Sequence, residues 1–188
     1  MLKVSSSDEW LDCVINDMDT FLPQHATAEK KASGMALSLV SHYPDKSDIV
    51  KTMTDIAIEE LAHFRDVLKL MQERNLLQCR DEKDGYVLQL RNHFRKGSED
   101  YLMDRLLAGA IIEARGAERF GLIAETLPES KLKTFYKTIT QSEERHHEVF
   151  ISLARKYFDD EAINKRLDIL LEIEARILEA LPVRCTLH

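Results

Sequence analysis

Residues 58–64, IEELAHF, and residues 141–148, QSEERHHE, decide how this 188-residue sequence folds. The first segment places His63 three residues after Glu60, and the second places His146 three residues after Glu143. Positions three apart lie on one face of an α-helix, so a carboxylate and an imidazole from the same turn can reach one site. The two segments therefore predict two helices that present metal-ligating side chains.

A further glutamate precedes each Glu-x-x-His pair at nearly the same distance. Glu29 lies 31 residues before Glu60, and Glu113 lies 30 residues before Glu143. The offset between the two halves is 84 for this first Glu and 83 for both the paired Glu and the His. The sequence thus repeats a Glu followed by Glu-x-x-His, which is the ligand pattern of ferritin-like bundles with two metal ions.

These four Glu and two His interrupt apolar stripes at helical spacing. The stripes are Leu22, His25, Glu29, Ala32, Ala36; Met53, Ile56, Glu60, His63, Val67; Leu106, Ala110, Glu113, Ala117, Phe120; and Ile139, Glu143, His146, Phe150, Leu153. Such stripes face a core, where carboxylates are unfavourable unless paired or coordinated, so four of them require cations. The set suits two iron or manganese ions better than zinc, magnesium or calcium.

Glu144 and His147 form an alternative Glu-x-x-His in the second segment. Their stripe also contains Thr140 and is more polar, so we favour Glu143 and His146 as the ligands.

Two other residues lie one helical turn from predicted ligands. His25 precedes Glu29 by four residues, and Asp66 follows His63 by three. Either side chain could orient a ligand from behind, although packing is the simpler role for His25.

Proline and glycine divide the chain into helical patterns, and no run alternates long enough between apolar and polar residues to predict a sheet. We expect an all-α, ferritin-like four-helix bundle, with residues 1–188 forming one domain. The expected helices are 7–21, 23–43, 46–77, 99–127, 129–157 and 160–181. The core bundle spans about 23–157, and the first and last helices flank it. Pro23 and Pro128 mark helix starts, whereas Pro44 and Pro182 mark helix ends.

The segment 78–97 is a long connection between the second and third core helices. Val87, Leu90 and Phe94 have helical spacing within it, so we expect a short helix there. A crossover of this length lets the core helices on either side run parallel. Ser98, followed by two acids, is expected to cap the next helix.

The composition excludes several classes of protein. An apolar fraction of 44% with only 6 Gly and 4 Pro excludes a disordered or fibrous chain. A net charge of −7 argues weakly against a non-specific nucleic-acid binder. No segment provides the ~20 apolar residues of a membrane helix, so no membrane partner is expected. Cys13, Cys79 and Cys185 are odd in number and far apart, so we expect no disulfide framework and a cytoplasmic location.

Four strings carry a resemblance to a known family. They are HATAEKKA (25–32), EELAHF (59–64), LLAGAIIEARGAERF (106–120) and SEERH (142–146). They resemble the tRNA-(2-methylthio-N6-isopentenyladenosine) hydroxylases (MiaE-like), which are non-haem di-iron enzymes of the ferritin-like superfamily. Glu-x-x-His alone would indicate only the superfamily, whereas the third and fourth strings are more specific.

The resemblance implies an oxygen-dependent monooxygenase that hydroxylates the isopentenyl group of the modified adenosine next to the anticodon in tRNA. It implies two Fe ions as cofactor and O2 as co-substrate. The implied iron ligands are Glu29 and His63 for one ion, Glu113 and His146 for the other, and Glu60 and Glu143 as bridges. Each turnover needs two electrons, and the chain has no Rossmann, flavin or iron–sulfur motif. We therefore expect an external electron donor of the ferredoxin or reductase type.

A compact basic group lies in the long connection. Arg91, Arg95 and Lys96, with His93 and Phe94, could hold phosphate while an anticodon-loop base is splayed out. A solvated charged surface is an equally good explanation of this group.

Three alternative functions stay open at this point. A ferritin- or bacterioferritin-like protein would oxidise and store iron, and a rubrerythrin-like peroxidase or manganese catalase would remove peroxide. A rubrerythrin normally adds a four-cysteine iron domain, which this sequence does not contain. A metal-free helical adaptor would leave the carboxylates in the apolar stripes unexplained.

Overall fold

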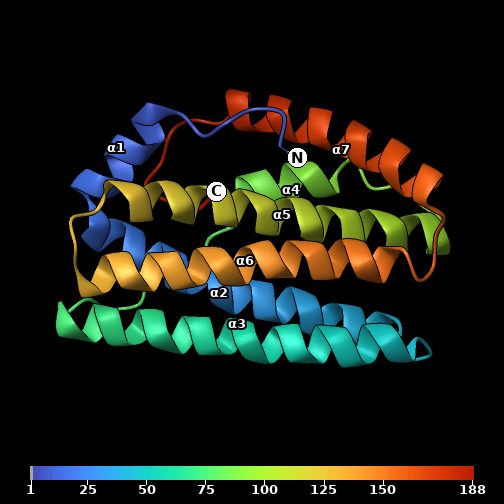
Figure 1. Cartoon of the computed structure of the whole chain (residues 1–188), viewed down its shortest axis with the longest axis horizontal. Helices are drawn as coiled ribbons and strands as arrows, with labels where there is room; N and C mark the ends of the chain where they lie inside the picture. The colour runs from blue at the N-terminus through green and yellow to red at the C-terminus, as the bar shows by residue number, and fades with distance from the viewer. Residues whose placement is uncertain (1) are drawn as a thin grey trace. The chain divides into compact units, whose positions relative to one another are not determined.

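The computed structural model describes residues 2–188, which form seven α-helices and no strand (Figure 1). The helices are α1 (Asp8–Asn16), α2 (Met18–His42), α3 (Ser47–Glu73), α4 (Gly85–Arg91), α5 (Ser98–Thr126), α6 (Lys131–Ala154) and α7 (Asp160–Ala180). The all-α prediction is therefore confirmed. None of these helices is long and apolar enough to span a membrane.

The described residues divide into two compact units. The α2–α3 unit contains Asp12–Glu82 and Arg184–Leu187, and the α5–α6 unit contains the described residues up to Leu11, Lys83–Val183 and His188. In the first, α2 packs against α3; in the second, α5 packs against α6, α7 and α4. Each unit therefore contains one half of the repeated pattern. The α2–α3 unit has Glu29 and the Glu60–His63 pair, and the α5–α6 unit has Glu113 and the Glu143–His146 pair. One domain over residues 1–188 stays a prediction.

α2 continues without interruption through Pro23, so the predicted helix boundary near residue 22 is wrong. The boundary lies at Asp17, whose carboxylate accepts a hydrogen bond from the Thr20 N–H at 3.2 Å and caps α2. Proline at the sixth position of a helix removes only one backbone hydrogen bond. Burial of Phe21 and Leu22, just before Pro23, favours the helical path despite this loss.

The long connection after α3 contains the predicted short helix, α4, with Tyr86 and Leu90 buried. The connection begins earlier than expected, because α3 ends at Glu73 rather than near residue 77. Asn75 has a φ of 58°, a left-handed conformation that Asn tolerates and that stops a helix.

The starts of α5 and α6 differ slightly from the predictions. Gly97, not Ser98, is the cap of α5, and Ser98 is its first helical residue. α6 begins two residues after the predicted start, because the Ser130 side chain accepts a hydrogen bond from the Lys133 N–H at 3.2 Å. Pro128 thus precedes the cap instead of opening the helix.

Gly109 allows α5 and α6 to approach closely. A Cβ atom at Gly109 would lie 2.7 Å from Cε1 of Phe150, inside van der Waals contact. The missing side chain therefore makes room for the Phe150 ring.

A disulfide joins Cys13 to Cys185, which corrects the expectation that the cysteines do not pair. The two residues are 172 positions apart, and both lie in the α2–α3 unit because residues 184–187 belong to it. Sequence spacing could not show this pair, since it depends on where the C-terminal segment returns. The expectation of a cytoplasmic location rested partly on the cysteines being unpaired, and the disulfide removes that support.

A buried ion-pair network holds α5 to α7. Arg115 is fully buried, and its Nε donates to Glu174 Oε1 at 2.9 Å while its Nη1 donates to Glu118 at 3.1 Å. The Tyr86 hydroxyl also donates to Glu174 Oε1, at 3.0 Å. Removing one partner from such a network leaves an uncompensated buried charge, so the network fixes the helix that carries Glu113.

Candidate metal centre

The α2–α3 unit brings together Glu29, Glu60 and His63, as the sequence predicted. One ligand atom from each lies within 4.8 Å of the others. His63 Nδ1 is 3.7 Å from Glu29 Oε2 and 3.4 Å from Glu60 Oε2. The two Glu residues are buried, whereas the His63 side chain is 13% exposed. We name these three residues the first triad.

His25 supports the first triad from within α2. Its Nε2 lies 2.5 Å from Glu29 Oε1, and the ring is fully buried. Burial alone would raise the pKa of Glu29, but the charge and hydrogen bond of His25 outweigh it, and the pKa of Glu29 is lowered. His25 therefore holds Glu29 as a carboxylate, the form that binds a cation. Asp66 lacks this role, because its carboxylate contacts Lys69 Nζ at 2.6 Å.

The two carboxylates also act on His63. Burial lowers the pKa of an imidazole, yet the nearby Glu29 and Glu60 carboxylates outweigh this effect and raise the pKa of His63 to about 10. A proton on His63 thus balances part of the acidic charge. Metal binding requires the neutral imidazole, so a cation would displace this proton.

The α5–α6 unit brings together Glu113, Glu143 and His146. One ligand atom from each lies within 4.8 Å of the others, and His146 Nδ1 is 3.7 Å from Glu143 Oε2. All three residues are at most 4% exposed. A Cβ atom at Gly116, one turn after Glu113, would lie 3.8 Å from Cγ of Glu143, so the Glu143 side chain passes close to the backbone of α5. We name these three residues the second triad.

The alternative pair in α6 has a different environment. Glu144 is exposed, and His147 Nδ1 lies 2.8 Å from the carbonyl oxygen of Ala110 on α5. These positions favour Glu143 and His146, whose side chains are buried, over Glu144 and His147.

The donor set of each triad fits a metal ion. Each offers two carboxylates and one imidazole in a buried setting, where carboxylates are unfavourable without a compensating cation. Mixed carboxylate and imidazole ligation suits iron or manganese, and neither triad contains the cysteine typical of structural zinc.

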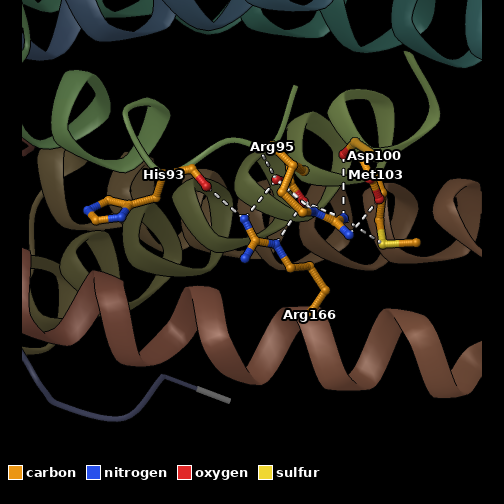
Figure 2. Close-up of polar contacts among 6 residues, drawn as sticks. His93, Arg95, Asp100, Met103 and Arg166 are labelled. Atoms are coloured by element: carbon orange, nitrogen blue, oxygen red, sulfur yellow. Dashed lines mark hydrogen bonds and ion pairs between the residues drawn. The ribbon is translucent and has the colours of Figure 1, made fainter. Parts of the chain in front are cut away.

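The basic group of the long connection is only partly available to a ligand. Arg91 and Lys96 are exposed, but Arg95 is committed to acids, with Nη2 2.8 Å from Asp104 and Nη1 2.6 Å from Asp100 (Figure 2). The pairing of Arg115 with Glu118, three residues later, is expected from helical spacing and is confirmed, whereas Asp104 and Glu174 were not predicted as buried acids. The signal for Asp104 was its place beside Arg105 between two apolar pairs, Leu102–Met103 and Leu106–Leu107.

Comparison with known proteins gives a consistent result. The sequence model of the tRNA-(MS[2]IO[6]A)-hydroxylase (MiaE) family matches residues 1–188. A tRNA 2-(methylsulfanyl)-N(6)-isopentenyladenosine(37) hydroxylase from Pseudomonas putida is 33% identical over 179 residues, covering 95% of this chain and 87% of the relative. A protein of the same name from Salmonella typhimurium is 31% identical over 156 residues, covering 83% of this chain and 57% of the relative.

A solved structure supports the fold. "Protein 43 with aldehyde deformylating oxygenase activity from Synechococcus" matches with a TM-score of 0.92 and 30% identity, covering 98% of this chain and 92% of that one. The prediction of a ferritin-like, all-α fold is thereby confirmed. From the family match over its whole length and these two relatives, we conclude that this chain belongs to the tRNA-(MS[2]IO[6]A)-hydroxylase (MiaE) family.

Proposed function

We propose that the two triads together form one di-iron centre. Glu29 and His63 would bind one iron, Glu113 and His146 the other, and Glu60 and Glu143 would bridge the pair. The repeat of the ligand pattern and the matching donor sets of the two triads support this assignment. The observation that carries it is the burial of four carboxylates in two helical pairs, in a chain of this hydroxylase family.

The protein is a tRNA-modifying hydroxylase by its family. We infer that it converts an allylic C–H bond of the isopentenyl group of 2-methylthio-N6-isopentenyladenosine, next to the anticodon, into C–OH. One atom of O2 enters the product, and the other leaves as water with two electrons and two protons from a donor. A bound di-iron centre would supply the chemistry of oxygen activation.

The residues of the chain contribute position and environment. His25 holds Glu29 ionised, and the network around Arg115 fixes the helix that carries Glu113. Buried side chains such as Ile139 and Phe120, in the same stripes as the ligands, exclude water from their surroundings.

The electron donor and the location follow from the reaction. Three cysteines, two of them in a disulfide, cannot hold a four-cysteine iron–sulfur cluster, so we propose a separate ferredoxin- or reductase-type donor. We also propose a cytoplasmic location, because the tRNA substrate is found there.

The test is a hydroxylation assay on tRNA that carries the isopentenylated nucleoside. Iron-loaded protein with reductant and O2 should add one oxygen atom to the nucleoside, detected by its mass after digestion. Glu113→Ala and His146→Ala should abolish this gain, whereas Glu144→Ala, at an exposed position one residue from Glu143, should retain it. No gain of oxygen by fully iron-loaded wild-type protein would contradict the hydroxylase function. Rapid consumption of peroxide or mineralisation of iron instead would favour the detoxifying or storage alternatives.

A further inference from the structure

Asp104 is a buried acid that has no role in the proposed reaction. It is fully buried in α5, nine residues before Glu113. At 1.5 Å per residue this separation is about 13–14 Å along the helix, too far for Asp104 to act on a metal bound at Glu113. Its role must therefore come from its own neighbours.

Arg95 and Arg166, both labelled in Figure 2, donate hydrogen bonds to the Asp104 carboxylate from two sides, an arrangement that we call the clasp. Arg95 donates to Asp104 Oδ1 through Nη2 at 2.8 Å and to Oδ2 through its backbone N–H at 2.8 Å. Arg166 of α7 donates to Oδ1 through Nε at 2.8 Å and to Oδ2 through Nη2 at 2.7 Å. Burial would raise the pKa of Asp104, but these hydrogen bonds outweigh it, and the pKa is lowered. Asp104 is thus a stable anion between two cations.

The clasp fixes the backbone of residues 91–97, which we name the basic loop. The Asp104 carboxylate accepts a hydrogen bond from the backbone N–H of Arg95, and Arg166 Nη2 donates to the carbonyl oxygen of His93 at 2.7 Å. Phe94 is half-buried and meets the Tyr101 ring edge-on, with centroids 5.9 Å apart. The loop is therefore attached to α5 and α7 by its backbone and by one aromatic side chain.

The outward-facing side chains of the basic loop are cationic. Its sequence, RNHFRKG, has three Lys or Arg residues and no acid. The Arg95 guanidinium is engaged by Asp104, whereas the side chains of Arg91, His93 and Lys96 are exposed. Among residues 2–188, neither Arg91 nor Lys96 forms an ion pair with an acid. Two cations are thus presented to solvent on a backbone that is already fixed.

We propose that the basic loop binds phosphates of the tRNA anticodon stem–loop through Arg91 and Lys96, and that Asp104 is the positioning residue that presents them. The inference rests on the proposed function, because tRNA is the polyanion that this enzyme must hold. Phosphate contacts fix the register of a nucleic acid, and a preformed loop loses little conformational entropy on binding. Arg95 is thereby removed from the predicted phosphate contacts and becomes part of the support.

The first test measures how the affinity for an isopentenylated anticodon stem–loop depends on salt. Each phosphate contact adds about −0.7 to the slope of log K against log[salt] for a single strand. Arg91→Ala and Lys96→Ala should each reduce the slope by about this amount and raise Kd roughly fivefold at 0.1 M salt. The control is Arg176→Ala, which removes an exposed α7 cation paired with Glu172 and should leave the slope unchanged. An unchanged slope in Arg91→Ala and Lys96→Ala would refute the phosphate contacts.

The second test separates positioning from simple stability. Asp104→Asn should raise KM for tRNA up to about 25-fold, the product of two lost contacts, with kcat within about twofold of wild type. A purely structural role would lower the active fraction, and hence kcat, without changing KM. Arg166→Gln removes the contact with His93 and should show the same KM effect if Asp104→Asn folds poorly. A wild-type KM in both variants would overturn the positioning role.

These tests also distinguish two kinds of failure. If wild-type protein binds the stem–loop with the predicted salt slope but adds no oxygen, the proposed function fails while the basic loop remains supported. If oxygen is added and the loop variants bind normally, only the inference about the loop fails.

Discussion

His25 is a buried imidazole that touches one carboxylate of the first triad. Its Nε2 lies 2.5 Å from Glu29 Oε1, and nothing in its position allows it to reach solvent. Residues behind a metal ligand orient it and tune its charge, and their loss typically reduces metal affinity about 10–100-fold. We expect His25→Ala to reduce Fe(II) affinity within this range, measured by metal titration.

The matched control is His42→Ala at the end of the same helix. His42 is exposed, and its Nδ1 contacts only polar atoms of Ser38 one turn earlier. This variant should bind iron as wild type does. Equal iron affinities for His25→Ala and wild type would show that His25 only fills space.

The candidate metal ligands were predictable from the sequence because they interrupt apolar helical stripes at corresponding positions in the two halves of the chain. This rule selected six residues, five of which are buried, and favoured Glu143 over the exposed Glu144; that the six bind metal stays a prediction. It did not find Asp104 or Glu174, which are buried against arginines from distant segments. The arginines that neutralise these two acids are set only by the fold, so the sequence does not show that either acid is paired.

At the scale of helices, α5 and α6 offer a test of close packing. A methyl group at Gly109 would overlap the Phe150 ring, with 2.7 Å to Cε1. Overpacking of this kind costs about 1–3 kcal/mol, more than the ~1 kcal/mol that alanine gains over glycine in a helix. We expect Gly109→Ala to lower the free energy of unfolding, measured by denaturant titration.

Gly34→Ala is the matched control. Gly34 is exposed in the middle of α2, and no atom lies within 4 Å of the position of its Cβ. Alanine should stabilise the protein there by about 0.5–1 kcal/mol. Stabilisation by both substitutions would mean that α5 and α6 do not approach as closely as described.

The helices themselves follow from local chemistry more reliably than their boundaries do. Six of the seven were expected, and the seventh, α4, lies in the segment where a short helix was anticipated. The boundary at Pro23 was misplaced because burial of Phe21 and Leu22 competes with the proline and prevails. Caps such as Asp17 set the true start, and they are single polar residues that resemble many others in the sequence.

At the scale of the whole chain, the Cys13–Cys185 disulfide ties the C-terminal residues to α1. It closes nearly the entire sequence into a loop, because the two residues are 172 positions apart. Disulfides that close long loops typically stabilise by about 2–4 kcal/mol. Reduction, or Cys185→Ser, should lower the free energy of unfolding by this amount, measured with and without a thiol reductant.

Cys79→Ser is the control for this experiment. Cys79 is the free cysteine, half-buried beside Thr27, and its replacement should leave the reductant sensitivity intact. Three free thiols in protein purified without reductant would contradict the disulfide. Sequence reasoning could not predict this bond, because the path of residues 181–188 has no periodic signal.

We propose that the two triads together serve one hydroxylation reaction on tRNA. The most direct test is a single-turnover reaction of protein loaded with Fe(II), which supplies the two electrons, with isopentenylated tRNA under isotopically labelled dioxygen, followed by the mass of the modified nucleoside. We predict one labelled oxygen atom per nucleoside, taken from the gas and not from water, since a monooxygenase transfers one atom of O2. An unchanged mass, or an oxygen atom derived from water, would contradict the account.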